Sequence, residues 1–131
     1  MSYDRIGVIG AMDSELAALI AALAQPARET VQGLVFHTGR LGAREVVLVR
    51  CGIGKVSAAR CTQVLIDRFA PDAVINTGIA GGLASGLAVG DIVVADGLVQ
   101  HDFDAAPIGF VRGLSLIHIS EPMRRRGISY A

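Results

Sequence analysis

Short apolar blocks alternate with polar or glycine-containing segments over most of this chain. Blocks of about four to eight residues that are rich in Val, Ile and Leu and lie between turn residues predict β-strands. By this criterion we expect strands at Arg5–Ile9, Val31–Thr38, Glu45–Arg50, Ala73–Asn76 and Ile92–Ala95. The segment Gly39–Gly42, between the second and third of these strands, predicts a hairpin turn.

Two segments carry apolar residues at the spacing of an amphipathic helix. The first follows Asp13 or Ser14, either of which can cap it, and a Gln-Pro pair predicts its end near Ala24. The second runs from Val56 to about Phe69. Strands joined by a hairpin are antiparallel, whereas strands joined by a helix are usually parallel. The pattern therefore predicts an α/β fold around a mixed sheet.

The turn Gly52–Lys55 precedes the second helix and shares its glycine–lysine ending with phosphate-binding loops. It lacks the full motif, because Val49 stands where the first glycine belongs and Val56 stands where Ser or Thr belongs. Ser57 at the third glycine position also weakens a dinucleotide-binding fingerprint. A turn that presents backbone N–H groups to a ligand and a purely structural turn both stay open.

Two features fall where α/β proteins bind ligands, beyond the carboxyl ends of strands. The segment Gly78–Gly82 has three glycines in five residues, which let a backbone approach a ligand closely and predict a ligand-facing loop. Glu15 lies in the first turn of the first predicted helix and can act there as an acid or a base. Acidic residues are also common in the first turn of any helix, because they complement its dipole.

The composition limits the class of protein. The 131 residues are enough for one domain or for part of one. Basic and acidic side chains balance at 12 each, which argues against a broad basic surface for nucleic acid. No apolar run reaches the length of about 18 residues expected of a membrane span, and the first residues do not resemble a signal peptide. We therefore expect a cytoplasmic protein with neither a nucleic-acid nor a membrane partner.

The other residues with reactive side chains do not form a recognisable site. Cys51 and Cys61 are too few for a disulfide framework or a zinc site, and we expect them to pack as small apolar groups. His101, Asp102 and Asp104 could bind a metal or act as acid and base, but nothing nearby completes a ligand set, so a polar loop is favoured. We expect no metal ion and no cofactor.

Five segments, taken in order, resemble the 5′-methylthioadenosine/S-adenosylhomocysteine nucleosidases. They are residues 6–15, 51–56, 75–83, 89–94 and 101–104, and the resemblance covers roughly residues 4–110. It implies a nucleoside phosphorylase-like fold, here truncated, in which helices flank a mixed sheet, and a homodimer when the domain is complete. It also implies a purine nucleoside substrate, whose N-glycosidic bond is hydrolysed with release of adenine.

The resemblance assigns site residues. Glu15 aligns with the glutamate that activates water. The binding positions, in chain order, are Met12, Ile53, Ala80, Gly81, Ala105 and Ile108. The first two align with the ribosyl and water region, the next two with the loop beside the purine, and the last two with a segment that reaches the neighbouring subunit's alkylthio pocket. The reaction needs a base for the water and an acid for the departing purine.

The loop Asn76–Ile79 bears on the choice of nucleophile. The resemblance extends to phosphorylases, which bind phosphate there through an arginine and a serine. Asn76 carries no charge and Ile79 carries no hydroxyl, so the loop favours water over phosphate. Two alternatives stay open: a hydrolase of futalosine or another purine nucleoside, and a non-catalytic purine-nucleoside-binding module.

We expect the chain to end before the second half of the family's domain. No residue can be assigned as the aspartate that protonates the purine or as the Met-Glu pair that grips the ribose. We expect residues 1–113 to be the N-terminal part of a nucleosidase domain. We expect residues 114–131 to be an artefactual tail outside the family, since Ser115–Pro122 resembles a translated sequencing adapter. Alone, such a chain is expected to be inactive, because the acid and the ribose-binding pair are missing. It is also expected to be poorly soluble, because a sheet without its later strands has an open edge.

Overall fold

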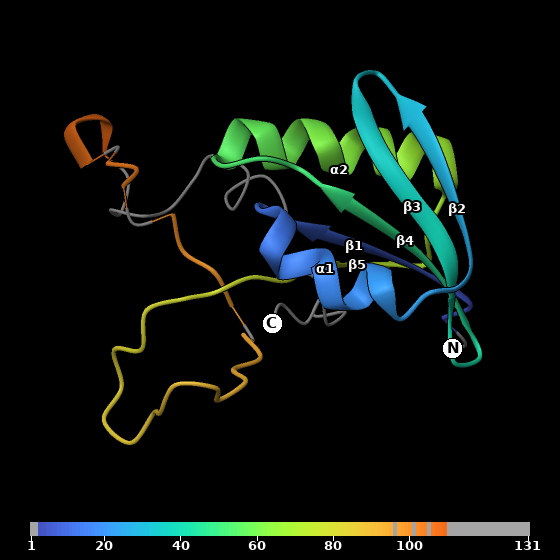
Figure 1. Cartoon of the computed structure of the whole chain (residues 1–131). Coiled ribbons are helices and arrows are strands. Elements are labelled where there is room, and N and C mark those ends of the chain that lie inside the picture. The colour runs from blue at the N-terminus through green and yellow to red at the C-terminus, as the bar shows by residue number, and fades with distance from the viewer. Residues whose placement is uncertain (1–2, 96, 101, 105, 110–131) are drawn as a thin grey trace.

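The chain folds into a mixed five-stranded sheet with one helix packed on each face (Figure 1). The structure, a computed structural model, describes residues 3–95, 97–100, 102–104 and 106–109. The strands are β1 (Arg5–Gly10), β2 (Ala24–Val31), β3 (Leu34–Leu41), β4 (Arg44–Arg50) and β5 (Ala73–Asn76). The helices are α1 (Asp13–Ala21), α2 (Lys55–Phe69) and a short 3₁₀ helix at Ala106–Ile108. The strand order is β2-β3-β4-β1-β5, which confirms the predicted α/β class with a mixed sheet.

The core lies on both faces of the sheet, and β4 contributes to each side. Successive residues of a strand point to opposite faces. Val49 faces α2, where it clusters with Leu65 and Phe36, and Leu48 faces α1, where it clusters with Leu16. All five side chains are fully buried. A strand covered on both sides is apolar throughout, which is why the sequence pattern identifies β4 and β1 so clearly.

The three parallel strands end at the same edge of the sheet. β1 lies between β4 and β5 and runs parallel to both. The pairing continues past the strands, because the Cys51 N–H donates to the Gly10 carbonyl and the Thr77 N–H donates to the Ile9 carbonyl, each at 2.9 Å. The loops that follow β1, β4 and β5 therefore begin side by side.

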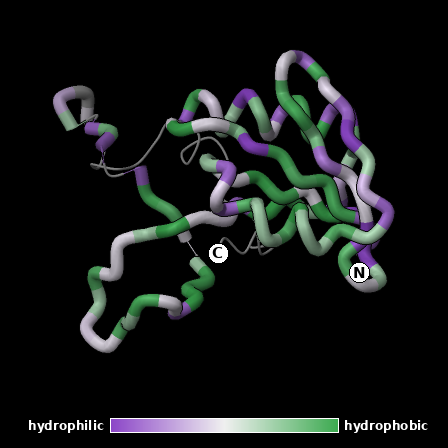
Figure 2. Tube along the Cα trace, viewed as in Figure 1, coloured by the Kyte–Doolittle hydropathy of each residue, from purple (hydrophilic) through white to green (hydrophobic). Residues whose placement is uncertain are grey.

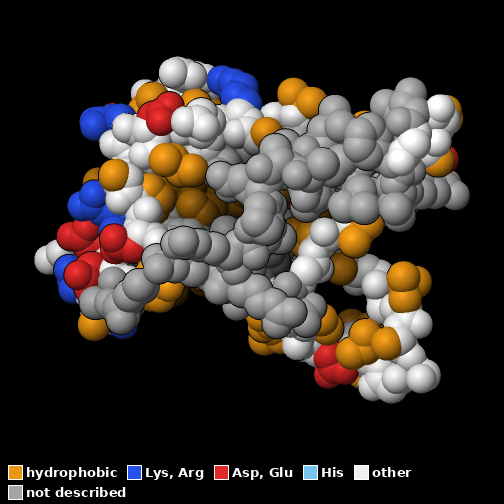
Figure 3. All heavy atoms as spheres, turned by 180° about the vertical axis from the view of Figure 1, so that it is seen from behind, with side chains coloured by type: hydrophobic (Ala, Val, Ile, Leu, Met, Phe, Trp, Pro, Cys, Tyr) orange, Lys and Arg blue, Asp and Glu red, His pale blue; other side chains and the backbone are white. Residues whose placement is uncertain are grey.

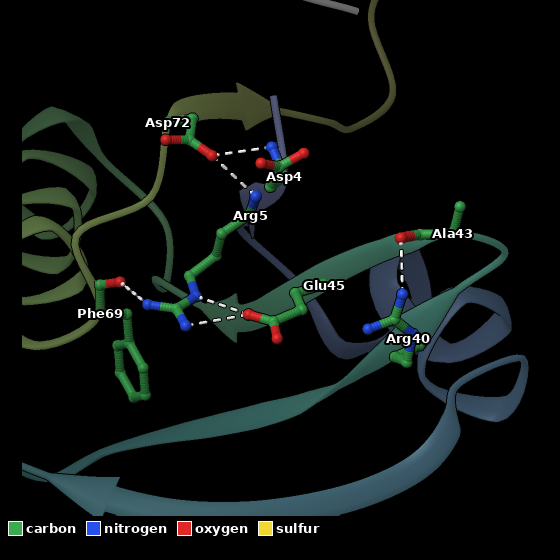
Figure 4. Close-up of polar contacts among 7 residues, drawn as sticks. All are labelled: Asp4, Arg5, Arg40, Ala43, Glu45, Phe69 and Asp72. Atoms are coloured by element: carbon green, nitrogen blue, oxygen red, sulfur yellow. Dashed lines mark hydrogen bonds and ion pairs between the residues drawn. The ribbon is translucent and has the colours of Figure 1, made fainter. Parts of the chain in front are cut away.

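A polar network joins the opposite edge, where these strands begin (Figure 4). One carboxylate oxygen of Asp72 accepts hydrogen bonds from the backbone N–H groups of Asp4 and Arg5, both at 2.8 Å. The Arg5 guanidinium pairs with Glu45 at 2.9 Å and donates to the Phe69 carbonyl at the end of α2, also at 2.9 Å. The backbone hydrogen bond that Arg5 donates has the largest effect in lowering the pKa of Asp72, and the one from Asp4 comes next. The positive charge of Arg5 lowers this pKa further.

β2 is the element that the hydrophobic pattern misses. Its residues are mostly exposed, and it pairs only with β3, at the edge of the sheet, where Pro26 is tolerated. The sequence predicts the first helix to end near Ala24, but α1 ends at Ala21 and Ala24 already begins β2. The strand register shifts between Ala24 and Ala27, at an irregularity that contains Pro26.

The hairpin turns also differ from the prediction. The predicted strand Val31–Thr38 is divided by a turn at Gln32 and Gly33, whose φ angles of 50° and 77° suit a two-residue hairpin. Most of the predicted turn Gly39–Gly42 belongs to β3, and the chain reverses at Gly42, where φ is 58°. The predicted hairpin itself is confirmed, since β3 and β4 pair antiparallel.

Residues 92–95 do not form the predicted buried strand. In the described part of the chain, Ile92, Val93 and Val94 have no strand neighbour and are 85%, 57% and 59% exposed, and Ala95 forms only an isolated bridge. A strand needs a neighbour for its backbone N–H and C=O groups. Within the described part of the chain, the sheet ends at β5, which pairs with β1 alone.

The close packing of β1 against α2 gives a stability prediction. A Cβ atom at Gly7 would lie 2.6 Å from a methyl carbon of Leu65, which is fully buried. Gly7→Ala is therefore expected to lower the free energy of unfolding by about 1–3 kcal/mol, measured by urea unfolding. Gly97→Ala is the control, because a Cβ there meets nothing within 4 Å. Equal stability of the two variants would contradict the packing.

The lowered pKa of Asp72 predicts a pH dependence. A carboxylate whose pKa is lower in the folded state stabilises the protein above its unfolded pKa, and this contribution is lost as the pH falls through the folded pKa. Asp72→Asn is expected to flatten the loss of thermal stability between about pH 5 and about pH 2. Asp67→Asn, an exposed change on α2, serves as the control. Parallel acid profiles for wild type and Asp72→Asn would contradict the assignment.

Candidate active site

Glu15 lies at the carboxyl edge of the sheet, in the first turn of α1 directly after β1. The sequence predicts Asp13 or Ser14 as the cap of this helix, and this prediction is wrong, because the N-cap is Met12 and both residues lie inside the first turn. The backbone N–H of Met12 donates to Oε2 of Glu15 at 2.9 Å, and the N–H of Glu15 donates to the Met12 carbonyl at 3.2 Å. Asp13 instead pairs with Arg50 of β4 at 3.1 Å. The short distance between Met12 and Glu15 thus comes from the cap of the helix.

The second carboxylate oxygen of Glu15 contacts the loop after β5. The backbone N–H of Ile79 donates to Oε1 at 3.3 Å. Each oxygen therefore accepts one backbone hydrogen bond, and the donor Ile79 lies 64 residues from Glu15 in the chain. A carboxylate has about four acceptor positions, so the half-buried Glu15 keeps the capacity to bind a water molecule.

Gly78 makes the contact between Glu15 and this loop possible. A Cβ atom at Gly78 would lie 2.8 Å from Oε1 of Glu15 and 3.3 Å from its carboxyl carbon. The sequence alone does not indicate that Gly78 lies against Glu15. The glycine run 78–82 was a signal that a close approach occurs in this loop, but only the fold shows that this glycine faces the carboxylate.

Cys51 follows β4 and lies near Glu15. Burial is the main effect that raises the pKa of its thiol, and the charge of Glu15 raises it further, while a hydrogen bond with its own backbone opposes the shift. Burial also raises the pKa of Cys61 to about 11. Both are buried free thiols. They stay protonated at neutral pH and pack as small apolar groups, as the sequence predicts.

The loop after β4 turns sharply into α2. Gly52 and Gly54 have φ angles of 82° and 103°, and α2 begins at Lys55. Ile53 between them is 80% exposed. The Lys55 ammonium contacts both carboxylate oxygens of Asp102, at 2.7 and 2.8 Å. This exposed ion pair brings residues 102–104 close to the start of α2.

The structure brings together only part of the predicted site. Glu15 contacts Met12 and the loop at Ile79, as described above. Ala80 and Gly81 are exposed in the same loop, beyond the contact with Glu15. Ala105 and His101 lie outside the described residues, and Ile108 ends the 3₁₀ helix. The binding roles of these residues stay predictions.

The described residues form neither a metal site nor a membrane span. No group of three or more His, Cys, Asp or Glu residues there could hold a metal ion. No helix in the same part of the chain has the length and apolar character needed to cross a membrane.

The contact between Gly78 and Glu15 can be tested by hydrogen exchange. Gly78→Ala places a methyl group against Oε1 and is expected to break the hydrogen bond from the Ile79 amide. A bond to a charged group contributes about 1.5–3 kcal/mol, so exchange of that amide is expected to rise at least about tenfold. Gly81→Ala is the control in the same loop, because a Cβ there meets nothing within 4 Å. Unchanged exchange at Ile79 would contradict the contact.

Comparison with known proteins places this arrangement in a family. The family model described as Phosphorylase superfamily matches residues 5–128. The 5′-methylthioadenosine/S-adenosylhomocysteine nucleosidase of Shewanella pealeana is 46% identical over 109 residues, which are 83% of this chain and 47% of that protein. The chain thus spans about half the length of the curated relatives it matches.

The chain is also similar to solved structures of nucleosidases. The nucleosidase of Colwellia psychrerythraea 34H, crystallised with adenine, is 43% identical with a TM-score of 0.85, over 88% of this chain and 48% of that chain. The S-adenosylhomocysteine nucleosidase of Streptococcus pyogenes, in complex with a methylthiotubercidin, is 40% identical with a TM-score of 0.82, over 98% of this chain and 51% of that chain.

The matched range also bears on the expected domain boundary. The family model continues to residue 128, past the boundary predicted between residues 113 and 114. Residues 110–131 lie outside the described part of the structure, so the predicted tail stays a prediction. The match covers nearly the whole chain, and the mixed sheet with two helices agrees with it. The chain belongs to the phosphorylase superfamily.

Proposed function

We propose that this chain supplies the water-activating part of an N-glycosyl hydrolase that releases adenine from 5′-methylthioadenosine and S-adenosylhomocysteine. The observation that carries the proposal is the carboxylate of Glu15, held by the N–H groups of Met12 and Ile79 at the carboxyl edge of the parallel strands. Similarity to nucleosidases crystallised with adenine or a nucleoside analogue supports the choice of substrate.

Glu15 is the proposed general base. Hydrolysis of an N-glycosidic bond passes through a state with oxocarbenium character, and a water molecule must be oriented and deprotonated as it attacks the sugar. Such proton transfer by a positioned side chain contributes about 10²–10⁴-fold to a rate. Two backbone hydrogen bonds fix the direction of the carboxylate, which reduces the cost of orienting it for each turnover.

The loop after β5 supports water as the nucleophile. Asn76 and Ile79 offer neither a positive charge nor a hydroxyl to a phosphate ion, and the backbone N–H of Ile79 already donates to Glu15. A phosphate site needs charged or multiple N–H donors. We propose that Ala80 and Gly81, which follow in this loop, lie beside the purine. We propose that Met12 and Ile53 line the ribosyl region.

The acid that protonates the purine and the groups that hold the ribose are proposed to come from the half of the domain that this chain does not span. Ala105 and Ile108 are proposed to reach the alkylthio pocket of a partner subunit in a homodimer. The two free, buried thiols fit a reducing cytoplasmic setting.

A chimera tests the role of Glu15. Residues 1–109 of this chain are joined to the remaining half of the Shewanella pealeana nucleosidase, and adenine release from methylthioadenosine is measured. Glu15→Gln in the chimera is expected to lower kcat by about 10²–10⁴-fold, because the amide cannot accept the proton. Ser14→Ala, an exposed change beside it, is the control. Full activity of Glu15→Gln, or hydrolysis of futalosine in preference to methylthioadenosine, would contradict the proposal.

The chain alone is expected to release no measurable adenine. The proposed base has no partner acid among the residues assigned to the site, and both are needed for the reaction. Adenine release by the purified 131-residue protein, followed by chromatography, checks this expectation. Turnover comparable to that of the chimera would show that the chain carries its own acid.

A further inference from the structure

A cleft lies between α1 and the hairpin that β2 and β3 form. α1 packs mainly on β4 and β1, and β2 and β3 extend beyond the edge of this helix (Figure 1). The cleft has a volume of about 250 Å³, and its apolar wall consists of Leu16 and Ile20 of α1 with Leu34 and Val35 of β3. It is therefore a small hollow with an apolar wall, and none of the residues proposed for the hydrolysis lines it.

Three basic side chains from neighbouring strands also line this cleft. They are Arg28 of β2, His37 of β3 and Arg50 of β4. Arg28 pairs with His37 across the β2–β3 ladder, and His37 pairs with Leu48 of β4. Leu48 packs against α1, and Arg50 lies two residues further along the same face of β4. The strand register therefore brings all three side chains to the α1 side of the sheet.

Little of the positive charge in this cleft is neutralised. Arg50 pairs through Nε with Asp13 at 3.1 Å, and both side chains are largely exposed. A guanidinium has five N–H donors, so most of those on Arg50 are left for another partner. Within the described residues, neither the Arg28 guanidinium nor the half-buried His37 ring has a hydrogen-bond or ion-pair partner. The cleft thus offers several donors that point to one small volume.

The two faces of β2 differ in how their charges are paired. This strand carries many hydrophilic residues (Figure 2). On its α2 side, Glu29 pairs with Arg68 at 2.7 Å. Seen from behind, several Lys and Arg side chains lie next to acidic ones (Figure 3). On the α1 side, Arg28 has no such carboxylate among the described residues.

From this arrangement we propose that the cleft binds a small organic anion, whose carboxylate lies between Arg28, His37 and Arg50. The aliphatic part of this ligand lies against the apolar wall of the cleft. A guanidinium binds a carboxylate through two parallel hydrogen bonds, which fixes the direction of the ligand. The proposal goes beyond the proposed hydrolysis and does not depend on it, because binding is measured without a nucleoside.

The charges and the wall select the class of ligand. Asp13 offsets part of the positive charge of Arg50, so a monoanion fits the cleft better than a dianion. Burial of apolar surface adds to binding, so a carboxylate with an aliphatic chain is favoured over an inorganic ion. The volume of about 250 Å³ is at the lower limit of ligand pockets and admits only a small molecule.

Hexanoate is a suitable probe, and the chimera described above presents the cleft in a complete domain. In a nuclear magnetic resonance titration, the side-chain signals of Arg28 and His37 are expected to shift and to saturate with hexanoate. Hexanol lacks the charge and acetate lacks the chain, so each is expected to bind at least about fivefold more weakly. Equal affinity for hexanol, or tighter binding of inorganic phosphate, would overturn the proposal. Binding by the 131-residue chain but not by the chimera would also overturn it, because the rest of the domain would then fill the cleft.

A matched pair of variants separates this cleft from general charge. Arg28→Gln in the chimera is expected to weaken hexanoate binding about fivefold, since one exposed ion pair is lost. Arg40→Gln is the control, because Arg40 is an exposed arginine near the other end of β3 and its loss changes the net charge equally. Adenine release is expected to be unchanged in both variants, which shows that each is folded. An equal loss of affinity in the two variants, or none in Arg28→Gln, would overturn the proposal.

Discussion

The parallel pairing of β1 between β4 and β5 is the constraint on which the rest of the structure depends. It places the ends of three strands, distant in sequence, at one edge of the sheet, and the loops that follow must then lie side by side. The pairing requires close packing on both faces. Gly7 allows Leu65 of α2 to approach the backbone of β1, and Gly10 allows Leu16 of α1 to do the same at 2.9 Å from a Cβ position. Glycines at these two positions therefore serve the packing of β1 rather than the binding of a ligand.

Glu15 shows how this edge becomes a candidate site. The carboxylate caps its own helix through the Met12 amide and also binds the Ile79 amide of the next parallel unit. One side chain thus stabilises a helix start and holds the loop that follows β5. The structural interpretation of an acidic residue in a first turn and the catalytic interpretation are compatible here, because the two hydrogen bonds that stabilise the helix and loop also orient the group.

The two edge strands of the sheet differ in polarity and in regularity. At one edge, β2 is polar, irregular and interrupted by Pro26, which protects it from pairing with other chains. At the other, β5 is short, apolar and open, and the chain continues into side chains that are suited to an interior. Ile92, Val93 and Val94 have the sequence of a buried strand and yet lie exposed, because an apolar pattern indicates the environment that a segment suits and not whether a neighbouring strand is present.

The sequence by itself determined the elements with a clear hydrophobic pattern, which are the apolar strands and the amphipathic helix α2. β1 and β4 are buried on both faces and β5 is half-buried, so unbroken apolar runs identify them, and α2 shows a clear amphipathic pattern. It did not reveal β2, because an edge strand buries too little surface to impose an alternation, and it misplaced the turns, because a reversal at Gln32 and Gly33 depends on φ angles rather than on hydrophobicity. The position of Glu15 as a candidate base followed from the resemblance. Only the tertiary structure decided that Gly78 and the Ile79 amide face it, because contacts across 64 residues depend on strand order, which no local pattern encodes.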